Sequence, residues 1–331
     1  MKIMVFDVPA ETGGALTILN QYYCSAIKDK ENDWIFIVST PNLEEADNVK
    51  VLNYPWIKKS WLHRLFFDYF IAKRIIENYK IDEVLSLQNT TIPRIKLKQT
   101  LYLHQSLPFI EKRYGLTENL KFWLYQNVIS KMIFKSIRKA DKVIVQTKWI
   151  RDAAIKMANE EKEKFILKQP ELNISVNRLY TSDENSENLF FYPASGLIYK
   201  NHEVIVNACK KLKEKGIKNY KVLFTLKGDE NKHIRMLKRI VVDERLPIDF
   251  IGSIDIEAVY DYYSKSILIF PSYIETFGLP LLEARKHESP ILASNCAFSH
   301  EVLEGYDRVK FFNPFESREL GDLMADSVRN Y

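Results

Sequence analysis

Short apolar runs alternate with longer helical patterns along almost all of the 331 residues, and this alternation most constrains the fold. In the first half the runs predict strands at residues 2–8, 34–40, 82–88, 99–105 and 141–147. In the second half they predict strands at residues 188–194, 220–228, 247–252, 266–272, 290–294 and 309–313. Strands that are apolar on both faces and separated by helices are typical of parallel sheets covered on both sides. The sequence therefore predicts an α/β protein with doubly wound parallel sheets.

Helical patterns fill the intervals between these strands. They predict helices at residues 15–28, 61–79, 120–139, 201–215, 232–242, 256–265 and 281–286. The longest polar stretch that lacks either period is "KQPELNISVNRLYTSDENSENL", with the break at 171–187. We therefore expect two Rossmann-like domains, residues 1–175 and 176–331. The carboxyl ends of their strands would face each other across a cleft, where a ligand is expected.

Composition limits the class of protein further. With 46% hydrophobic and 13% aromatic residues, the chain can build full cores. No apolar run approaches the roughly 18 residues needed to span a bilayer, and the N-terminus does not resemble a signal peptide. The three cysteines are far apart, which favours reduced thiols over disulfides or a zinc site. These features indicate a cytoplasmic protein.

The positive charge is concentrated in one segment. Residues 50–140 carry 17 Lys and Arg against 6 Asp and Glu, interleaved with Trp, Phe and Tyr at near-helical spacing. Such a segment suits an anionic partner, and our hypothesis is peripheral contact with an anionic membrane at its inner face. The alternative is that these are core helices whose basic residues are solvated. The aromatic helical character does not argue for nucleic acid.

The strongest motif lies in "SILIFPSYIETFGLPLLEARKHESPILAS", residues 266–294. A buried strand is followed by a loop, Thr276 to Leu279, and then by a helix with Pro280 at its first position. The unpaired N–H groups of Phe277, Gly278 and Leu279 would form a positive pole for an anionic group. Glu275 and Glu283 flank this loop, and carboxylates suit sugar hydroxyls. The pattern therefore predicts a ligand that carries both phosphate and polyol, whereas either glutamate alone would be read as an ordinary surface acid.

The second motif is "FYPASGLIYKNHEVIVNA", where a strand ends and Lys200 and Asn201 open a helix. A lysine at the start of a helix opposes the helix dipole, which favours acids there. Such a local conflict is expected at a functional site, here a diphosphate bound by the ammonium group. The alternative is a solvated lysine.

Two weaker signals lie in the first half. Gly13 and Gly14 follow the first strand, where a backbone can approach a ligand closely, but they form neither GxGxxG nor GxxxxGK[ST]. His104 ends an apolar strand, where its loop would face the cleft. No Asp-x-Asp and no cluster with metal-ligand spacing occurs in the sequence, so we expect no metal cofactor to bridge a diphosphate.

Taken together, the segments "PSYIETFGLPLLEA…SPILASN…EV", "YPASGLIYKNHEVIVNA" and "FIGSIDIEAVYDYYSKS" resemble GT-B glycosyltransferases of family 4, including their Glu-x7-Glu motif. The resemblance implies a retaining, metal-independent transfer of a sugar from a UDP- or GDP-linked donor, with no further cofactor. It implies that Glu283 binds the ribose, Lys200 the diphosphate, and Glu275 with the Phe277–Leu279 backbone the donor sugar. Gly14 would approach the phosphates, and His104 would contact the transferred sugar. The acceptor, a glycan or a lipid-linked glycan, would lie mainly in the first domain.

The chain departs from the family pattern in two places. Many relatives carry an arginine five positions before the lysine, where this chain has Ser195; Lys227 of "TLKGDE" is the expected substitute. Relatives also continue with a helix that crosses back onto the first domain, so we expect this closing element to be short or missing after "ESRELGDLMADSVRNY". These departures place Ser195 and Lys227 among the expected donor-binding residues.

The resemblance favours an enzyme of surface or capsular polysaccharide synthesis. Two other functions stay open from the sequence: a sugar-nucleotide epimerase of the same architecture, and a non-catalytic partner subunit. The base, the sugar, the acceptor and the oligomeric state are not identified by the sequence.

Overall fold

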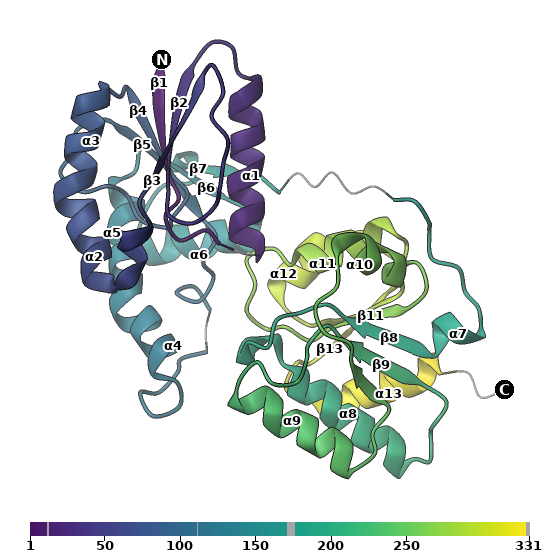
Figure 1. The fold of residues 1–331 in the computed structure, drawn as a ribbon. Helices are drawn as coiled ribbons and strands as arrows, with labels where there is room; N and C mark the ends of the chain where they lie inside the picture. The colour runs from purple at the N-terminus through teal and green to yellow at the C-terminus, as the bar shows by residue number, and fades with distance from the viewer. Residues whose placement is uncertain (12, 111, 171–175, 329–331) are drawn as a thin grey trace. The chain divides into compact units, whose positions relative to one another are not determined.

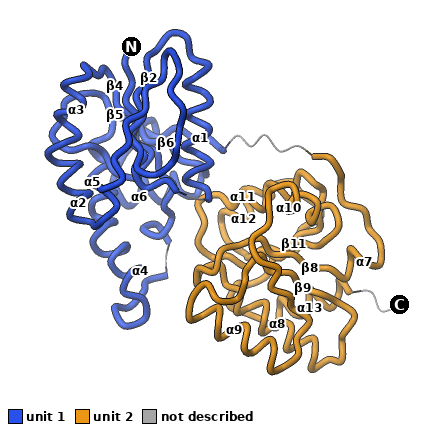
Figure 2. The backbone as a smooth tube through the Cα atoms, in the orientation of Figure 1, with its two compact units in different colours: residues 1–171 blue, residues 172–331 orange. Residues whose placement is uncertain are grey.

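The computed structural model describes residues 1–11, 13–110, 112–170 and 176–328. The chain divides into two compact units, residues 1–171 and 172–331 (Figure 2). The domain boundary expected between residues 175 and 176 adjoins residues 171–175, which lie outside the described residues.

The first unit is built on a seven-stranded parallel sheet in the order β3-β2-β1-β4-β5-β6-β7 (Figure 1). Its strands are β1 (Lys2–Phe6), β2 (Asp33–Val38), β3 (Val49–Asn53), β4 (Glu83–Ser86), β5 (Lys98–Leu103), β6 (Lys142–Val145) and β7 (Phe165–Leu167). The five strands expected in this half are confirmed. The edge strands β3 and β7 were not expected, because half-exposed residues and a length of three residues give them little apolar pattern.

The helices of this unit are α1 (Gly13–Lys28), α2 (Trp61–Phe66), α3 (Ala72–Tyr79), α4 (Leu120–Leu124), α5 (Ser130–Lys139) and α6 (Lys148–Ala158). Short 3₁₀ turns span Pro55–Lys59 and Lys162–Lys164. The helices expected at 61–79 and 120–139 are each interrupted by a π-helical segment, Phe67–Ile71 and Tyr125–Ile129. Such π-helical turns occur frequently at functional sites.

Alternate residues of the central strand β1 face opposite sides of the sheet. Met4 and Phe6 lie in one buried cluster with Phe67 and Ile76. Val5, on the opposite face, packs with Ile18 of α1. Both faces of the sheet are therefore covered, which explains why the strand is apolar throughout.

The second unit has a six-stranded parallel sheet in the order β10-β9-β8-β11-β12-β13. Its strands are β8 (Leu189–Tyr192), β9 (Lys221–Phe224), β10 (Ile248–Phe250), β11 (Ile267–Phe270), β12 (Ile291–Ser294) and β13 (Val309–Phe312). All six expected strands are confirmed. The strand order reverses between β8 and β11, so the loops after these two strands diverge at a topological switch point.

The helices of the second unit are α7 (Glu184–Glu187), α8 (His202–Glu214), α9 (Lys232–Asp243), α10 (Ile256–Tyr263), α11 (Leu279–Lys286), α12 (Ala297–Val302) and α13 (Ser317–Ser327), with a 3₁₀ turn at Ile198–Lys200. Helices α8, α9 and α13 cover one face of the sheet, and α10, α11 and α12 cover the other (Figure 1). Helix α13 packs on α8: a Cβ at Gly321 would lie 3.4 Å from the Ala208 carbonyl oxygen. The last described helix thus packs within its own unit.

None of the helices in the described part of the chain is long and apolar enough to cross a membrane.

Asp7, directly after β1, is fully buried. No described side chain donates a hydrogen bond to its carboxylate oxygens, and the backbone N–H of Ala10 is the nearest donor group for them. Burial raises its pKa to about 8, although the positive charge of Arg64, the backbone N–H of Ala10 and the positive charge of Lys58 oppose this effect. Burial in the folded chain therefore favours the protonated form of Asp7.

We predict that Asp7→Asn removes a pH dependence of stability. Because the pKa rises from 3.8 to about 8 on folding, the folded chain retains a proton that the unfolded chain loses in this window. The free energy of unfolding should fall as pH rises from 4 to 8, by at most about 1.4 kcal/mol per pH unit. Urea unfolding at several pH values measures this. Asp47→Asn, at an exposed carboxylate of the same unit, is the control. If wild type and Asp7→Asn show the same pH profile, the assignment is wrong.

Candidate functional site

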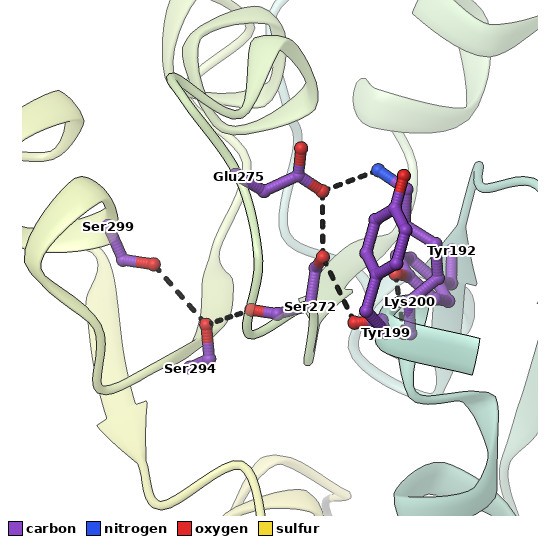
Figure 3. Close-up of polar contacts among 7 residues, drawn as sticks. All are labelled: Tyr192, Tyr199, Lys200, Ser272, Glu275, Ser294 and Ser299. Atoms are coloured by element: carbon purple, nitrogen blue, oxygen red, sulfur yellow. Dashed lines mark hydrogen bonds and ion pairs between the residues drawn. The ribbon is translucent and has the colours of Figure 1, made fainter. Parts of the chain in front are cut away.

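The loops that follow β8 and β11 bring two predicted site residues together, Lys200 and Glu275. The Lys200 ammonium and the Glu275 carboxylate form an ion pair across 75 residues of sequence (Figure 3). Their side chains are only 17% and 16% exposed, respectively. Solvent screening is therefore weaker than for a surface pair. The sequence predicted each residue separately but not their pairing.

Backbone geometry at Lys200 differs from the expectation. Lys200 ends the 3₁₀ turn, Asn201 follows in the left-handed region with φ of 59°, and α8 begins only at His202. The Asn201 amide donates to the carbonyl of Pro314 at 2.6 Å, and the Tyr192 hydroxyl donates to the carbonyl of Lys200 at 2.7 Å. Lys200 therefore lies on a turn just before the helix, and hydrogen bonds from Tyr192 and Asn201 fix this turn. The prediction that Lys200 opens the helix was wrong.

Hydroxyl groups hold Glu275 from the other side. The Ser272 hydroxyl lies 2.7 Å from the Glu275 carboxylate and 3.3 Å from the carbonyl of Tyr199 (Figure 3). The Ser294 hydroxyl donates to the carbonyl of Ser272 at 2.6 Å and lies 3.4 Å from the Ser299 hydroxyl. This chain of serines links the β11 loop to β12 and α12. Sequence reasoning missed it; the signal available was a serine at the end of each of two predicted strands, residues 266–272 and 290–294.

The helix that follows the turn between Glu275 and Glu283 begins one residue earlier than predicted. Helix α11 begins at Leu279, and Pro280 is its second residue. Gly278 caps the helix with φ of 86°, in the left-handed region that favours glycine. The N–H groups of Phe277, Gly278 and Leu279 donate no hydrogen bond within the described chain. These N–H groups are the ones for which the sequence predicts a positive pole.

Glu283 lies in a different environment from Glu275. The buried Tyr263 hydroxyl donates to Glu283 Oε2 at 3.0 Å. Burial raises the pKa of Glu283 above its ordinary value, and the hydrogen bond from Tyr263 partly opposes this rise. One oxygen is therefore fixed by Tyr263, which orients the carboxylate. Tyr263 had not been predicted as a site residue.

Ser195 and Lys227 are both exposed, on the loops after β8 and β9. Asn231 links these loops by donating to the carbonyl of Gly196 at 2.7 Å. Within the described residues, no carboxylate lies within ion-pair distance of the Lys227 ammonium. The substitution of Lys227 for the arginine expected at Ser195 stays a prediction.

Gly14 and His104 belong to the first unit. Gly14 lies in the first turn of α1, where a Cβ would meet no atom within 4 Å. His104 follows β5, and its N–H donates to Asn89 Oδ1 at 2.8 Å. Its Nδ1 is buried and makes no hydrogen bond to any described residue. Burial lowers the pKa of His104 to about 4, so the imidazole is neutral near pH 7.

No group of three His, Cys, Asp or Glu side chains that could hold a metal ion occurs in the described ranges.

Comparison with known proteins agrees with this architecture. Residues 180–330 match the family "Glycosyl transferases group 1". The structure of HepE (Alr3699) from Anabaena in complex with UDP and glucose superposes with a TM-score of 0.70 at 16% identity, over 100% of this chain and 90% of that one. The structure of WaaG, a glycosyltransferase involved in lipopolysaccharide biosynthesis, superposes with a TM-score of 0.71 at 14% identity, over 99% of this chain and 90% of that one. The fold is therefore of the GT-B type.

The family match falls within the second unit. In sequence, the chain is 24% identical over 242 residues to the O-antigen chain mannosyltransferase RfbU of Salmonella typhimurium. The alignment covers 72% of this chain and 63% of that protein.

We predict that Gly278→Ala disrupts the turn. The left-handed backbone alone costs an alanine about 1–2 kcal/mol. The new Cβ would also lie 3.2 Å from Leu281 Cδ1. Gly216→Ala is a matched control, because Gly216 has a similar φ of 76° but no atom within 4 Å of a Cβ. Thermal unfolding should show a larger loss for Gly278→Ala. Equal losses for the two variants would show that packing around the turn is unimportant.

Proposed function

We propose that the chain is a retaining, metal-independent glycosyltransferase of family 4 that uses a UDP- or GDP-linked sugar. The observation that carries this proposal is that Lys200, Glu275, Glu283 and the free N–H groups of the Phe277–Leu279 turn share one edge of one sheet. This edge offers one cation, a helix N-terminus and two carboxylates. A diphosphate needs the first two, and sugar hydroxyls suit the carboxylates.

In the proposed complex the diphosphate competes with Glu275 for the Lys200 ammonium. Lys227 and the Phe277–Leu279 N–H groups supply the remaining positive potential, so no bridging metal ion is needed. When Lys200 turns toward the phosphates, Glu275 stays in place through Ser272 and is free to accept hydrogen bonds from the donor sugar. Glu283, oriented by Tyr263, accepts hydrogen bonds from the ribose.

In the first unit, Gly14 leaves open space beside the start of α1 for a close approach of the phosphates. The neutral imidazole of His104 has an unused, buried Nδ1. A neutral histidine can bind a sugar hydroxyl without placing a second positive charge beside a developing oxocarbenium ion. We assign His104 to the transferred sugar on this ground.

The relatives named for O-antigen and lipopolysaccharide synthesis support a glycan or lipid-linked glycan as the acceptor. We therefore propose a role in the synthesis of surface polysaccharide, carried out in the cytoplasm.

We predict that the two glutamates have separable roles. Glu283→Ala should weaken UDP or GDP binding by about tenfold, or about 1.4 kcal/mol, because the ribose loses its acceptor. Glu275→Ala should leave nucleotide affinity within about threefold and lower the turnover. Calorimetry and a transfer assay measure the two effects, with Glu214→Ala at an exposed glutamate as control.

Three outcomes would contradict the proposal. If the wild-type chain binds neither nucleotide, it is not a working transferase. If the donor sugar is epimerised without an acceptor, the epimerase function holds instead. If both glutamate variants lose donor affinity alone, with turnover intact, the division of roles is wrong.

We also propose peripheral attachment to an anionic membrane. Large apolar side chains are exposed on α2, α4 and the π-helical segments after them, which lie at the same end of the first unit (Figure 1). These are Trp61, Leu62, Phe66, Phe70, Leu120, Leu124 and Val128. The exposed lysines Lys59, in the 3₁₀ turn before α2, and Lys121, in α4, would contact anionic headgroups.

We predict that the double variant Phe66→Ser/Phe70→Ser releases the chain from vesicles that contain anionic lipid. The two rings are adjacent, with centroids 5.5 Å apart, and their exposed area would be buried in the headgroup region. Met236→Ser/Val242→Ser is the matched control, since these apolar residues are equally exposed in the second unit. Flotation that is insensitive to lipid charge, or equal for both double variants, would refute this attachment.

A further inference from the structure

Asn201 joins the turn that carries Lys200 to two other loops of the second unit. Its side-chain amide donates to the carbonyl of Pro314 at 2.6 Å and to the carbonyl of Pro271 at 3.3 Å. Pro271 directly follows β11, and Pro314 lies in the loop after β13. These two hydrogen bonds span 113 and 70 residues of sequence. A single side chain therefore connects the loops after β8, β11 and β13.

The position of Asn201 has two requirements that select asparagine. Its backbone lies in the left-handed region, with φ of 59°, which glycine and asparagine tolerate better than other residues. Two carbonyl oxygens also face it and need hydrogen-bond donors. A glycine has no side chain to donate, and an ionised aspartate only accepts, whereas an asparagine amide carries two N–H donors. Asparagine therefore satisfies the backbone and both carbonyls together.

The residues before Asn201 are held by further contacts. The buried Tyr192 hydroxyl, at the end of β8, donates to the carbonyl of Lys200 at 2.7 Å (Figure 3). The backbone N–H of Tyr273, in the loop after β11, donates to the carbonyl of Tyr199 at 3.2 Å. Three consecutive residues of the turn thus each bond to another part of the second unit. These bonds fix the backbone from which the Lys200 side chain extends.

A fixed backbone is important for Lys200 because its charge lies at the end of a long side chain. The ammonium group contacts Glu275 and lies 5.6 Å from the centre of the Tyr199 ring. Ordering a lysine side chain on a ligand costs conformational entropy, and a mobile turn would add the cost of ordering its backbone. A turn that is ordered before the ligand arrives avoids this second cost.

We propose that Asn201 is a positioning residue that gives the chain a preference for nucleoside diphosphates over nucleoside monophosphates. It would hold the turn so that the Lys200 ammonium meets the diphosphate at a defined point. A monophosphate lacks the second phosphate group and depends less on this point. Asn201 itself would not contact the ligand, because both of its amide hydrogens bond to carbonyls. This inference rests on the proposed transferase function, which assigns Lys200 to the diphosphate.

The test compares UDP and GDP with UMP and GMP by calorimetry on the full chain. Asn201→Gly keeps the left-handed backbone and removes both hydrogen bonds. We expect it to weaken diphosphate binding about tenfold and monophosphate binding less than about threefold. Lys200→Ala should lose the same preference. The double variant should bind no more weakly than Lys200→Ala alone, because Asn201 acts only through Lys200.

Matched variants separate positioning from a general loss of structure. Asn159→Gly is the control for Asn201→Gly, because Asn159 has φ of 55° and its side chain makes no hydrogen bond to the described residues. Tyr192→Phe removes one hydroxyl and keeps the buried ring, and it should lower the preference about threefold. Tyr220→Phe, which removes a hydroxyl that donates to the Cys209 carbonyl at 3.3 Å, should leave the preference unchanged.

Competitive acylation of the lysines, measured by mass spectrometry, tests the position of Lys200 without any nucleotide. Asn201→Gly should raise the reactivity of Lys200 at least about threefold relative to the other lysines, since a turn that opens more often exposes the amine more often. Asn159→Gly should not raise it. Unchanged reactivity of Lys200 in the Asn201→Gly variant would overturn the proposal.

The binding results separate this proposal from the transferase function. If Asn201→Gly weakens diphosphates and monophosphates equally, or if the double variant binds more weakly than Lys200→Ala, Asn201 supports the unit as a whole and the proposal is wrong. If the wild-type chain binds neither UDP nor GDP, the transferase function fails and the preference for diphosphates fails with it. The acylation result then decides by itself whether Asn201 positions Lys200.

Discussion

The contact between Lys200 and Glu275 is the interaction on which the candidate site depends. It joins the loops after β8 and β11 at the switch point of the sheet, where the chain leaves two neighbouring parallel strands in different directions. The two side chains are about one-sixth exposed. The attraction between them is therefore stronger than in a surface ion pair, but breaking it costs less than breaking a fully buried one. The ion pair therefore preorganises both charges and can still be exchanged when a stronger anion enters.

The two carboxylates Glu275 and Glu283 lie in different surroundings. Glu275 contacts the Lys200 ammonium and the Ser272 hydroxyl. Glu283 is held by a tyrosine hydroxyl in a more buried position, where its pKa is raised. The different partners of the two carboxylates are the basis for proposing different roles for them. Spacing in the sequence placed the pair but could not distinguish the two members.

Much of the second unit was predictable because its strands are buried on both faces and so form continuous apolar runs. The edge strands β3 and β7 were missed because half-exposed or very short strands lack such runs. The π-helical segments were missed because one extra residue in a helical turn leaves the apolar pattern almost unchanged. The contact between Lys200 and Glu275 joins residues far apart in sequence. Only the folded chain reveals it.

The most direct test of the central claim is a crystal structure of the chain with a bound nucleotide-diphosphate sugar. The account predicts the diphosphate between the Lys200 ammonium and the N–H groups of Phe277 to Leu279, with the ribose hydroxyls on Glu283 and the sugar on Glu275. It also predicts that the contact between Lys200 and Glu275 lengthens while Ser272 stays on the carboxylate. A diphosphate bound elsewhere, with the ion pair unchanged, would contradict it.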